Sequence, residues 1–131
     1  MYSKYFNNDV ELPSYSMIAG DKETLIFEVY DIEGNPYNVN DKTRVKALKW
    51  VLSPYGQIDN TVCELLGTPV DSNNVATDGD TNRFAVLLGT SDTINLNSGL
   101  YLQQPVIVGD AQENRLGQGI ITIYRAIQYK G

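Results

Sequence analysis

The segment TLIFEVY, residues 24–30, is followed directly by the turn-forming segment DIEGNP, residues 31–36. In the first segment, Leu25, Phe27 and Val29 alternate with residues of the opposite parity, and this period of two is typical of a β-strand. We therefore expect these three side chains to face a core. The Gly, Asn and Pro of the second segment predict a turn that ends the strand.

The same pattern of short apolar runs separated by turn residues recurs along the whole chain. It predicts strands at residues 15–19, 24–30, 37–39, 44–52, 57–66, 83–88, 100–108 and 116–127. Residues 91–94 are expected to form one helical turn, and residues 67–81 a long exposed loop with a brief strand near Val75. Because no segment is suited to a crossover helix, we expect antiparallel pairing.

The fold class expected from these elements is all-β. It is an immunoglobulin-like antiparallel β-sandwich of about seven strands, in one domain spanning residues 15–131. Residues 1–14 lack alternation and are expected to form an N-terminal arm outside the sandwich. The segment around Leu96 and Tyr101 resembles a tyrosine corner, in which the hydroxyl of a tyrosine early in a late strand bonds to the backbone just upstream.

Five residues are candidates for an interface with other proteins. Tyr2, Tyr5 and Phe6 are aromatic residues in an otherwise polar arm, where docking on a neighbour competes with a tail that has no fixed structure. Ile26 and Tyr30 have the outward parity of the 24–30 strand. They are expected either to lie in an interface or to pack under a loop.

Composition excludes several classes of function. The chain has 42% hydrophobic and 20% charged residues, with a formal net charge of -6, which disfavours binding to nucleic acid. It contains no histidine, which removes the common catalytic triads and zinc sites. The single cysteine, Cys63, excludes an internal disulfide and is expected to be buried. We expect no signal peptide, no membrane span, no cofactor and no enzymatic activity.

Three further features have a functional and a structural interpretation. The segment DGDTN, residues 78–82, resembles the start of a calcium loop, but Arg83 and Gly89 stand where that loop needs Gly and Glu, so a polar turn is favoured. Glu28 lies inside a strand on the outward parity and is expected to face solvent. Trp50 shares the parity of apolar neighbours and is expected in the core, with a sugar-binding platform as the alternative.

Several segments, taken in order, resemble the immunoglobulin-like domains of tailed-phage structural proteins. The nearest resemblance is to the N-terminal domain of phage baseplate upper proteins. It is carried by residues 19–36, 48–56, 84–88, 92–93, 98–101 and 117–123, and it covers roughly residues 18–127. Such domains attach receptor-binding or fibre proteins to the virion, so the resemblance implies a structural role without catalytic residues.

The function expected from this resemblance is that of a bacteriophage or prophage virion structural protein of the tail or baseplate type. It would be made in the bacterial host cytoplasm and act in the virion through contacts with other virion proteins and with its own copies, as a homo-oligomer. The sequence ends soon after the last expected strand, which keeps a head, neck or capsid decoration protein as one alternative. A carbohydrate-binding or adhesin module, with glycan contacts, is the other.

Overall fold

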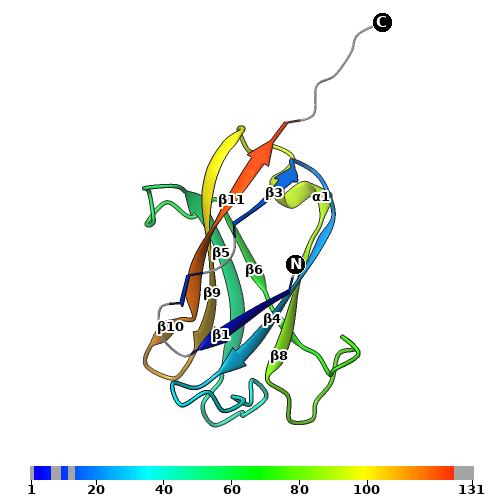
Figure 1. The fold of residues 1–131 in the computed structure, drawn as a ribbon, viewed down its shortest axis with the longest axis vertical. Coiled ribbons are helices and arrows are strands. Elements are labelled where there is room, and N and C mark those ends of the chain that lie inside the picture. Colours follow the sequence, from blue (N-terminus) through cyan, green and yellow to red (C-terminus); the bar gives the residue numbers. More distant parts are fainter. Residues whose placement is uncertain (1, 7–9, 12–13, 126–131) are drawn as a thin grey trace, which may run out of the picture.

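A computed structural model describes residues 2–6, 10–11 and 14–125 of the chain, and it contains two facing β-sheets (Figure 1). The elements are β1 (Tyr2–Phe6), β2 (Val10–Glu11), β3 (Tyr15–Ile18), β4 (Glu23–Tyr30), β5 (Ala47–Pro54), β6 (Cys63–Leu66), β7 (Thr68–Pro69), β8 (Arg83–Leu88), α1 (Thr90–Thr93), β9 (Gly99–Val108), β10 (Glu113–Arg115) and β11 (Gly117–Tyr124). Within the described residues, no helix is long and apolar enough to cross a membrane.

The strand order confirms the expected all-β sandwich. One sheet has the order β1-β4-β8-β7, and the other has the order β2-β11-β9-β5-β6, with β3 also on the edge of β11 and β10 on β9. The antiparallel groups β4-β8-β7 and β11-β9-β5 correspond to the B-E-D and G-F-C strands of immunoglobulin-like sandwiches. The tyrosine corner is also confirmed, because the Tyr101 hydroxyl, near the start of β9, donates to the backbone carbonyl of Asn97 at 2.7 Å.

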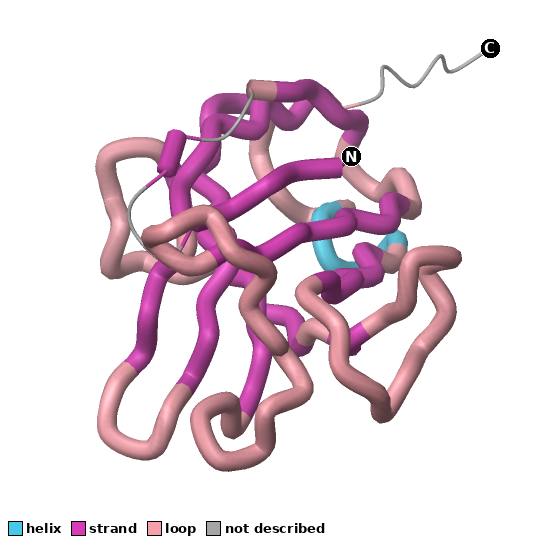
Figure 2. The backbone as a smooth tube through the Cα atoms, turned by 60° about the horizontal axis from the view of Figure 1, so that its bottom comes forward, coloured by secondary structure: helices cyan, strands magenta, loops and turns pink. Residues whose placement is uncertain are grey.

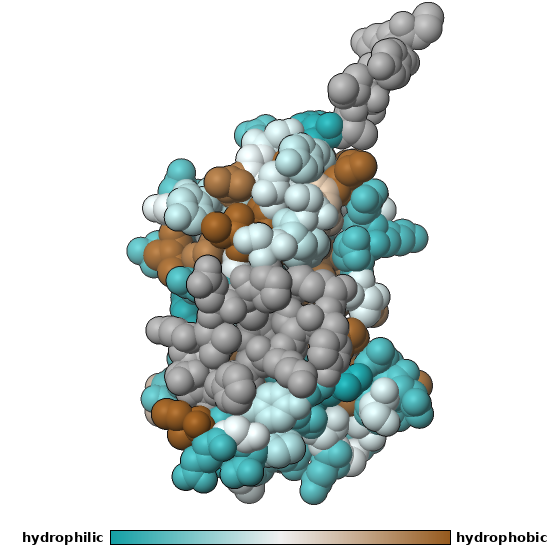
Figure 3. Space-filling view, viewed as in Figure 1, coloured by the Kyte–Doolittle hydropathy of each residue, from teal (hydrophilic) through white to brown (hydrophobic). Residues whose placement is uncertain are grey.

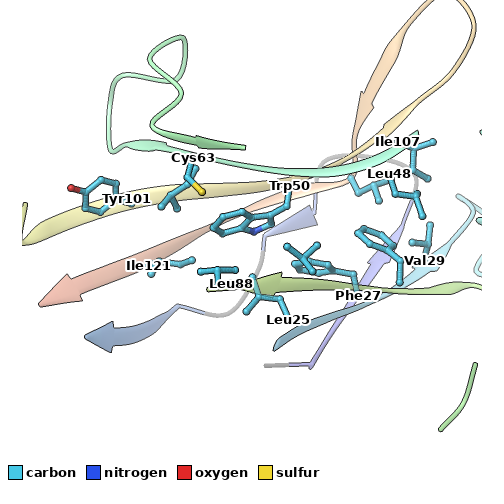
Figure 4. Close-up of a cluster of buried hydrophobic side chains, with 14 of the residues drawn as sticks. Leu25, Phe27, Val29, Leu48, Trp50, Cys63, Leu88, Tyr101, Ile107 and Ile121 are labelled. Carbon is cyan, nitrogen blue, oxygen red and sulfur yellow. The ribbon is translucent and has the colours of Figure 1, made fainter. Parts of the chain in front are cut away.

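The core lies between the two sheets, as the alternation in β4 predicts. Leu25, Phe27 and Val29 are fully buried, and the ring centroids of Phe27 and Phe84 are 5.2 Å apart. Figure 4 shows Trp50, from β5, lying between the layers and pointing toward the β4 side chains. Trp50 is fully buried, which confirms its expected place in the core and leaves it unavailable as a sugar platform.

The prediction of a long exposed loop at residues 67–81 is wrong for its first residues. The chain passes from one sheet to the other at Gly67 and forms β7 directly afterwards. β6 belongs to one sheet and β7 to the other, and this single residue joins them. A Cβ atom at position 67 would lie 2.6 Å from Cδ2 of Phe84, so only glycine allows the chain to pass this close to the core. Beyond β7 the chain forms a tight hairpin closed by a bridge between Val70 and Ala76.

Three strand boundaries also differ from expectation. Residues 37–39 are not a strand, because the Val39 N–H bonds to the Thr81 carbonyl across two loops. Residues 44–46 precede β5 in a turn where the Asp41 carbonyl accepts from the N–H groups of Arg44 and Val45. Residues 57–61 form turns, so the strand expected from residue 57 begins only at Cys63. In the last two cases local hydrogen bonds in turns shorten the strand, whereas at residues 37–39 a bond to a distant loop replaces strand pairing.

The N-terminal residues differ most from expectation. β1 pairs in parallel with β4, and β2 and β3 pair in parallel with β11. The expectation of an arm outside the sandwich is therefore wrong for Tyr2–Phe6 and Val10–Glu11, and purely antiparallel pairing is wrong at these edges. Two parallel strands need a long connection, which is usually a helix. Between β1 and β4 this connection runs through β2 and β3 of the opposite sheet, so no helix is needed. Residues 1, 7–9 and 12–13 of the expected arm lie outside the described residues.

Candidate interaction surface

The five expected interface residues lie on two neighbouring strands. In the register of β1 with β4, Tyr2 is opposite Ile26 and Phe6 is opposite Tyr30, while Tyr5 is opposite Val29. The side chains of Tyr2, Tyr5 and Phe6 are outside the described part of the structure, so their role in an interface stays a prediction.

Ile26 is buried within the chain, in a small cluster with Val70 and Ala85. This arrangement matches the alternative in which Ile26 packs under a loop, because Val70 begins the hairpin that covers this part of the sheet. Tyr30 is half-buried, and its hydroxyl donates to the Glu28 carboxylate. These two side chains therefore have partners inside the molecule.

Glu28 is buried, so the expectation that it faces solvent is wrong. Its Oε2 forms an ion pair with Nη2 of Arg83 on the adjacent strand β8, at 3.2 Å. The Arg83 side chain also donates to Asn74 in the β7–β8 hairpin, at 3.2 Å. The period of two predicted the outward direction of Glu28 correctly, but the covering hairpin depends on tertiary structure that this period does not reveal.

The loops joining β4 to β5, β7 to β8 and β9 to β10 meet at one end of the sandwich, at the bottom of Figure 1, which the turned view of Figure 2 brings forward. Asn40 connects the first two of these loops. It is buried, and its amide nitrogen donates to the carbonyls of Thr77 at 2.9 Å and Gly79 at 2.8 Å. Asn38 adds a bond to the Asp80 carboxylate at 3.0 Å.

These bonds give the 78–82 segment a structural explanation. Two of the carbonyls in and beside it already accept hydrogen bonds from the Asn40 amide, and one of its carboxylates accepts from Asn38. The amide groups thus hold the loop in its shape, in agreement with a polar turn. Within the described residues, no three acidic or cysteine side chains form a group suited to a metal ion.

Two hairpins at this end have the same internal geometry. The Asp31 carboxylate accepts from the N–H groups of Glu33 and Asn35, and the Asp71 carboxylate accepts from residues at the same spacing, 73 and 75. Each turn has one residue with positive φ, Gly34 at 86° and Asn74 at 62°. Both residue types tolerate this conformation, so the two hairpins are rigid and locally determined.

The loop end is strongly acidic. Residues 31–46, 71–82 and 109–112 carry seven acidic and three basic side chains, in a chain whose formal net charge is -6. The best-organised of these carboxylates is Asp41, whose pKa is lowered to about 2 by hydrogen bonds from the Thr43 and Arg44 side chains. Asp41 is offset by its ion pair with Arg44, and the remaining excess of acidic side chains gives the loop end a net negative charge.

A different kind of surface lies on the outer face of the sheet that contains β9 and β11. We call it the outer-face patch. It consists of side chains that point away from the core and are at least partly exposed: Ile18, Tyr55, Val62, Leu100, Leu102, Ile120 and Tyr124. Their exposed fractions reach 57% for Tyr55, 54% for Tyr124 and 49% for Leu100. Figure 3 shows brown side chains on the upper left of the molecule, over the region where β9 and β11 run.

The strand register makes this patch continuous. Ile18 is opposite Tyr124, and Leu102 is opposite both Ile120 and Ser53 on its two sides. The Tyr55 N–H donates to the Leu100 carbonyl, which extends the patch across to the end of β5. These neighbours come from four strands and a connecting turn.

Charged side chains on this face gather in its other half, toward the acidic loops. Lys49 Nζ lies 2.7 Å from Glu113 Oε1 and 2.9 Å from Glu64 Oε1. The pKa of Lys49 is raised by the hydrogen bond to Glu113 and then by that to Glu64. Arg115 donates to Gln104. This half of the face is therefore neutralised internally, and the patch half is apolar.

The sequence contains a signal for this patch. Leu100, Leu102 and Ile120 interrupt the polar positions expected on a solvated face, so the start of β9 is apolar on both parities and β11 has an apolar residue on its outward parity. Continuous apolar strands are typical of sheets that are covered on both faces.

No family model and no curated protein matches this chain.

Proposed function

We propose that this chain is a non-catalytic structural component of a tailed-phage particle, of the tail or baseplate type. It acts through contacts with other virion proteins after synthesis in the host cytoplasm. The observation that carries the proposal is the outer-face patch, an exposed apolar surface on a rigid sheet of a sandwich. A head, neck or capsid decoration protein would use the same surface, so the position in the particle is decided by the experiment below.

The patch supports a protein contact because exposed apolar surface is costly unless a partner covers it. The largest contiguous apolar patch on a monomeric protein covers about 300–600 Å² and is often a functional surface. The large aromatic side chains Tyr55 and Tyr124 are of the type enriched where proteins meet. The rigid sheet below them lowers the entropy lost on binding.

The non-covalent contacts that hold the fold together also suit an assembly component made in a reducing cytoplasm. The chain has one cysteine, and the structure is held by packing around Trp50 and by the Asn40 bonds between loops. A sandwich with a single cysteine folds without an internal disulfide and would present many identical surfaces once it is assembled. Repeated weak contacts then give high avidity.

Quantitative mass spectrometry of gradient-purified particles, from the phage or prophage that encodes this chain, tests the proposal. We expect the chain at a fixed multiple of a tail protein, retained after a high-salt wash and enriched in isolated tails over isolated heads. Enrichment in heads would reject the tail assignment and favour the decoration alternative. Presence in the lysate with absence from purified particles would contradict a structural role.

A further inference from the structure

The outer-face patch and the positions between its members carry no charge. Ten outward positions make up this half of the face: Ser16, Ile18, Ser53, Tyr55, Val62, Leu100, Leu102, Ile120, Thr122 and Tyr124. In contrast, the described loops at the opposite end of the molecule are acidic. A partner seated on the patch therefore needs apolar surface and no complementary charge.

A second copy of this chain meets both requirements, because it carries the same uncharged apolar patch. The exposed parts of the patch side chains amount to an area on the order of 500 Å², the upper part of the range for a single patch on a monomer. A standard interface buries about 800 Å² on each partner. Two facing patches would therefore bury about 1,000 Å² in total, the lower limit for a specific interface, and the pair is expected to be weak.

Charge decides how two copies would be oriented. If the strands of the two facing sheets ran in the same direction, the acidic loop ends would lie side by side and repel each other. If a two-fold axis runs within the interface and across the strands, the loop ends point in opposite directions. A closed two-fold pair is also the commonest symmetry of soluble oligomers.

We propose that the outer-face patch binds the same patch of a second copy, in a two-fold pair with antiparallel orientation. Leu100 lies near the middle of this interface, between Tyr55 on one side and Thr122 on the other. This inference rests on the proposed function as an assembly component and specifies its self-contact. Because the area is modest, we expect association in the micromolar range, which the high local concentration in a particle would favour.

Sedimentation equilibrium of the full chain tests the pair. We expect the mass to rise with concentration from the 14.6 kDa of one chain to twice that value and no further. Leu100→Glu places two carboxylates in an apolar contact and should weaken association at least tenfold. Leu87→Glu is the matched control, because Leu87 is 69% exposed on the outer face of the other sheet. This control should associate like the wild-type chain.

Circular dichroism establishes that each variant is folded, and Tyr124→Glu, at the edge of the patch, replaces Leu100→Glu if the latter does not fold. A wild-type chain that stays monomeric up to about 1 mM would overturn the inference, and so would a Leu100→Glu chain that still pairs. A monomeric chain that is nevertheless abundant in purified particles would reject the self-contact and leave the proposed function standing. A chain that pairs in solution but is absent from purified particles would support the self-contact and reject the proposed function.

Discussion

At the scale of single residues, buried polar atoms determine how the core fits together. The indole N–H of Trp50 donates to Oε1 of Gln103 at 2.9 Å, across two strands and in a fully buried position. The bond explains why a glutamine is tolerated between the sheets. Trp50 of β5 therefore contributes to the core both by packing and by a hydrogen bond.

Replacing Trp50 with alanine tests this convergence. The change leaves a large cavity and removes the indole hydrogen bond to the buried Gln103 amide, and we expect it to lower the free energy of unfolding by about 3–5 kcal/mol. Urea denaturation followed by circular dichroism measures the loss, with Trp50→Phe as a smaller change. A loss below about 1 kcal/mol would mean that Trp50 is not a core residue.

Cys63 provides a second test at this scale, based on pH. Burial, followed by the negative charge of Asp92, raises the pKa of the Cys63 thiol from 9.0 to about 11. The folded chain thus keeps its proton at pH values where an unfolded chain loses it. Stability contributed by the neutral thiol is present below pH 9 and is lost as the pH rises toward 11.

We therefore expect Cys63 to react slowly with an aromatic disulfide reagent at pH 8.5 in the folded chain. The rate should rise by orders of magnitude in denaturant, where both burial and the raised pKa are lost. Absorbance of the released thiolate measures both rates. Equal rates in the two conditions would show that Cys63 is exposed in the native state.

At the scale of elements, Asn40 makes one unit of two loops that are distant in sequence. Asn40→Ala removes both hydrogen bonds to the carbonyls of Thr77 and Gly79, and we expect a loss of about 1–3 kcal/mol. Hydrogen exchange should also become faster in residues 77–81. Asn60→Ala is the matched control, since Asn60 is exposed and its amide donates to the side chain of Gln57, three residues away. Similar effects of both substitutions would disprove the link between the loops.

The elements also show how far the sequence predicts the fold. The period of two located β4 and β8 closely, because alternate side chains of each face the core, and an apolar run bounded by turn residues located β9. It did not predict the change of sheet at Gly67 or the parallel pairing of β1, since both depend on segments far apart in the chain. Local alternation reports the direction of a side chain but not what covers it, as Glu28 and Ile26 demonstrate.

The residues expected in an interface and the outer-face patch do not overlap. Expectation favoured aromatic residues near the N-terminus and two positions on β4, whereas among the side chains that the structure describes the most extensive apolar exposure lies on β9, β11 and their neighbours. In the sequence, the patch is indicated by apolar residues at the outward positions of these two strands, Leu100, Leu102 and Ile120. A single strand with that pattern is consistent with either a covered or an exposed face, and only the sheet order resolves it.

At the scale of the whole molecule, the two ends of the sandwich differ in character. The loop end is acidic and rigidly bonded, and the outer-face patch near the opposite end is uncharged and apolar. This polarity allows copies to associate through one surface while the charged ends stay apart in water. In the proposed pair, repulsion between the acidic loop ends would therefore favour the antiparallel orientation.

Hydroxyl-radical footprinting, comparing the assembled chain with the dilute chain, tests most directly whether the outer-face patch is the working surface. We expect Tyr55, Leu100 and Tyr124 to lose most of their labelling on assembly. The exposed loop residues Ile32 and Val75 should keep theirs. Unchanged labelling of the patch together with protection of the two loop residues would contradict this account.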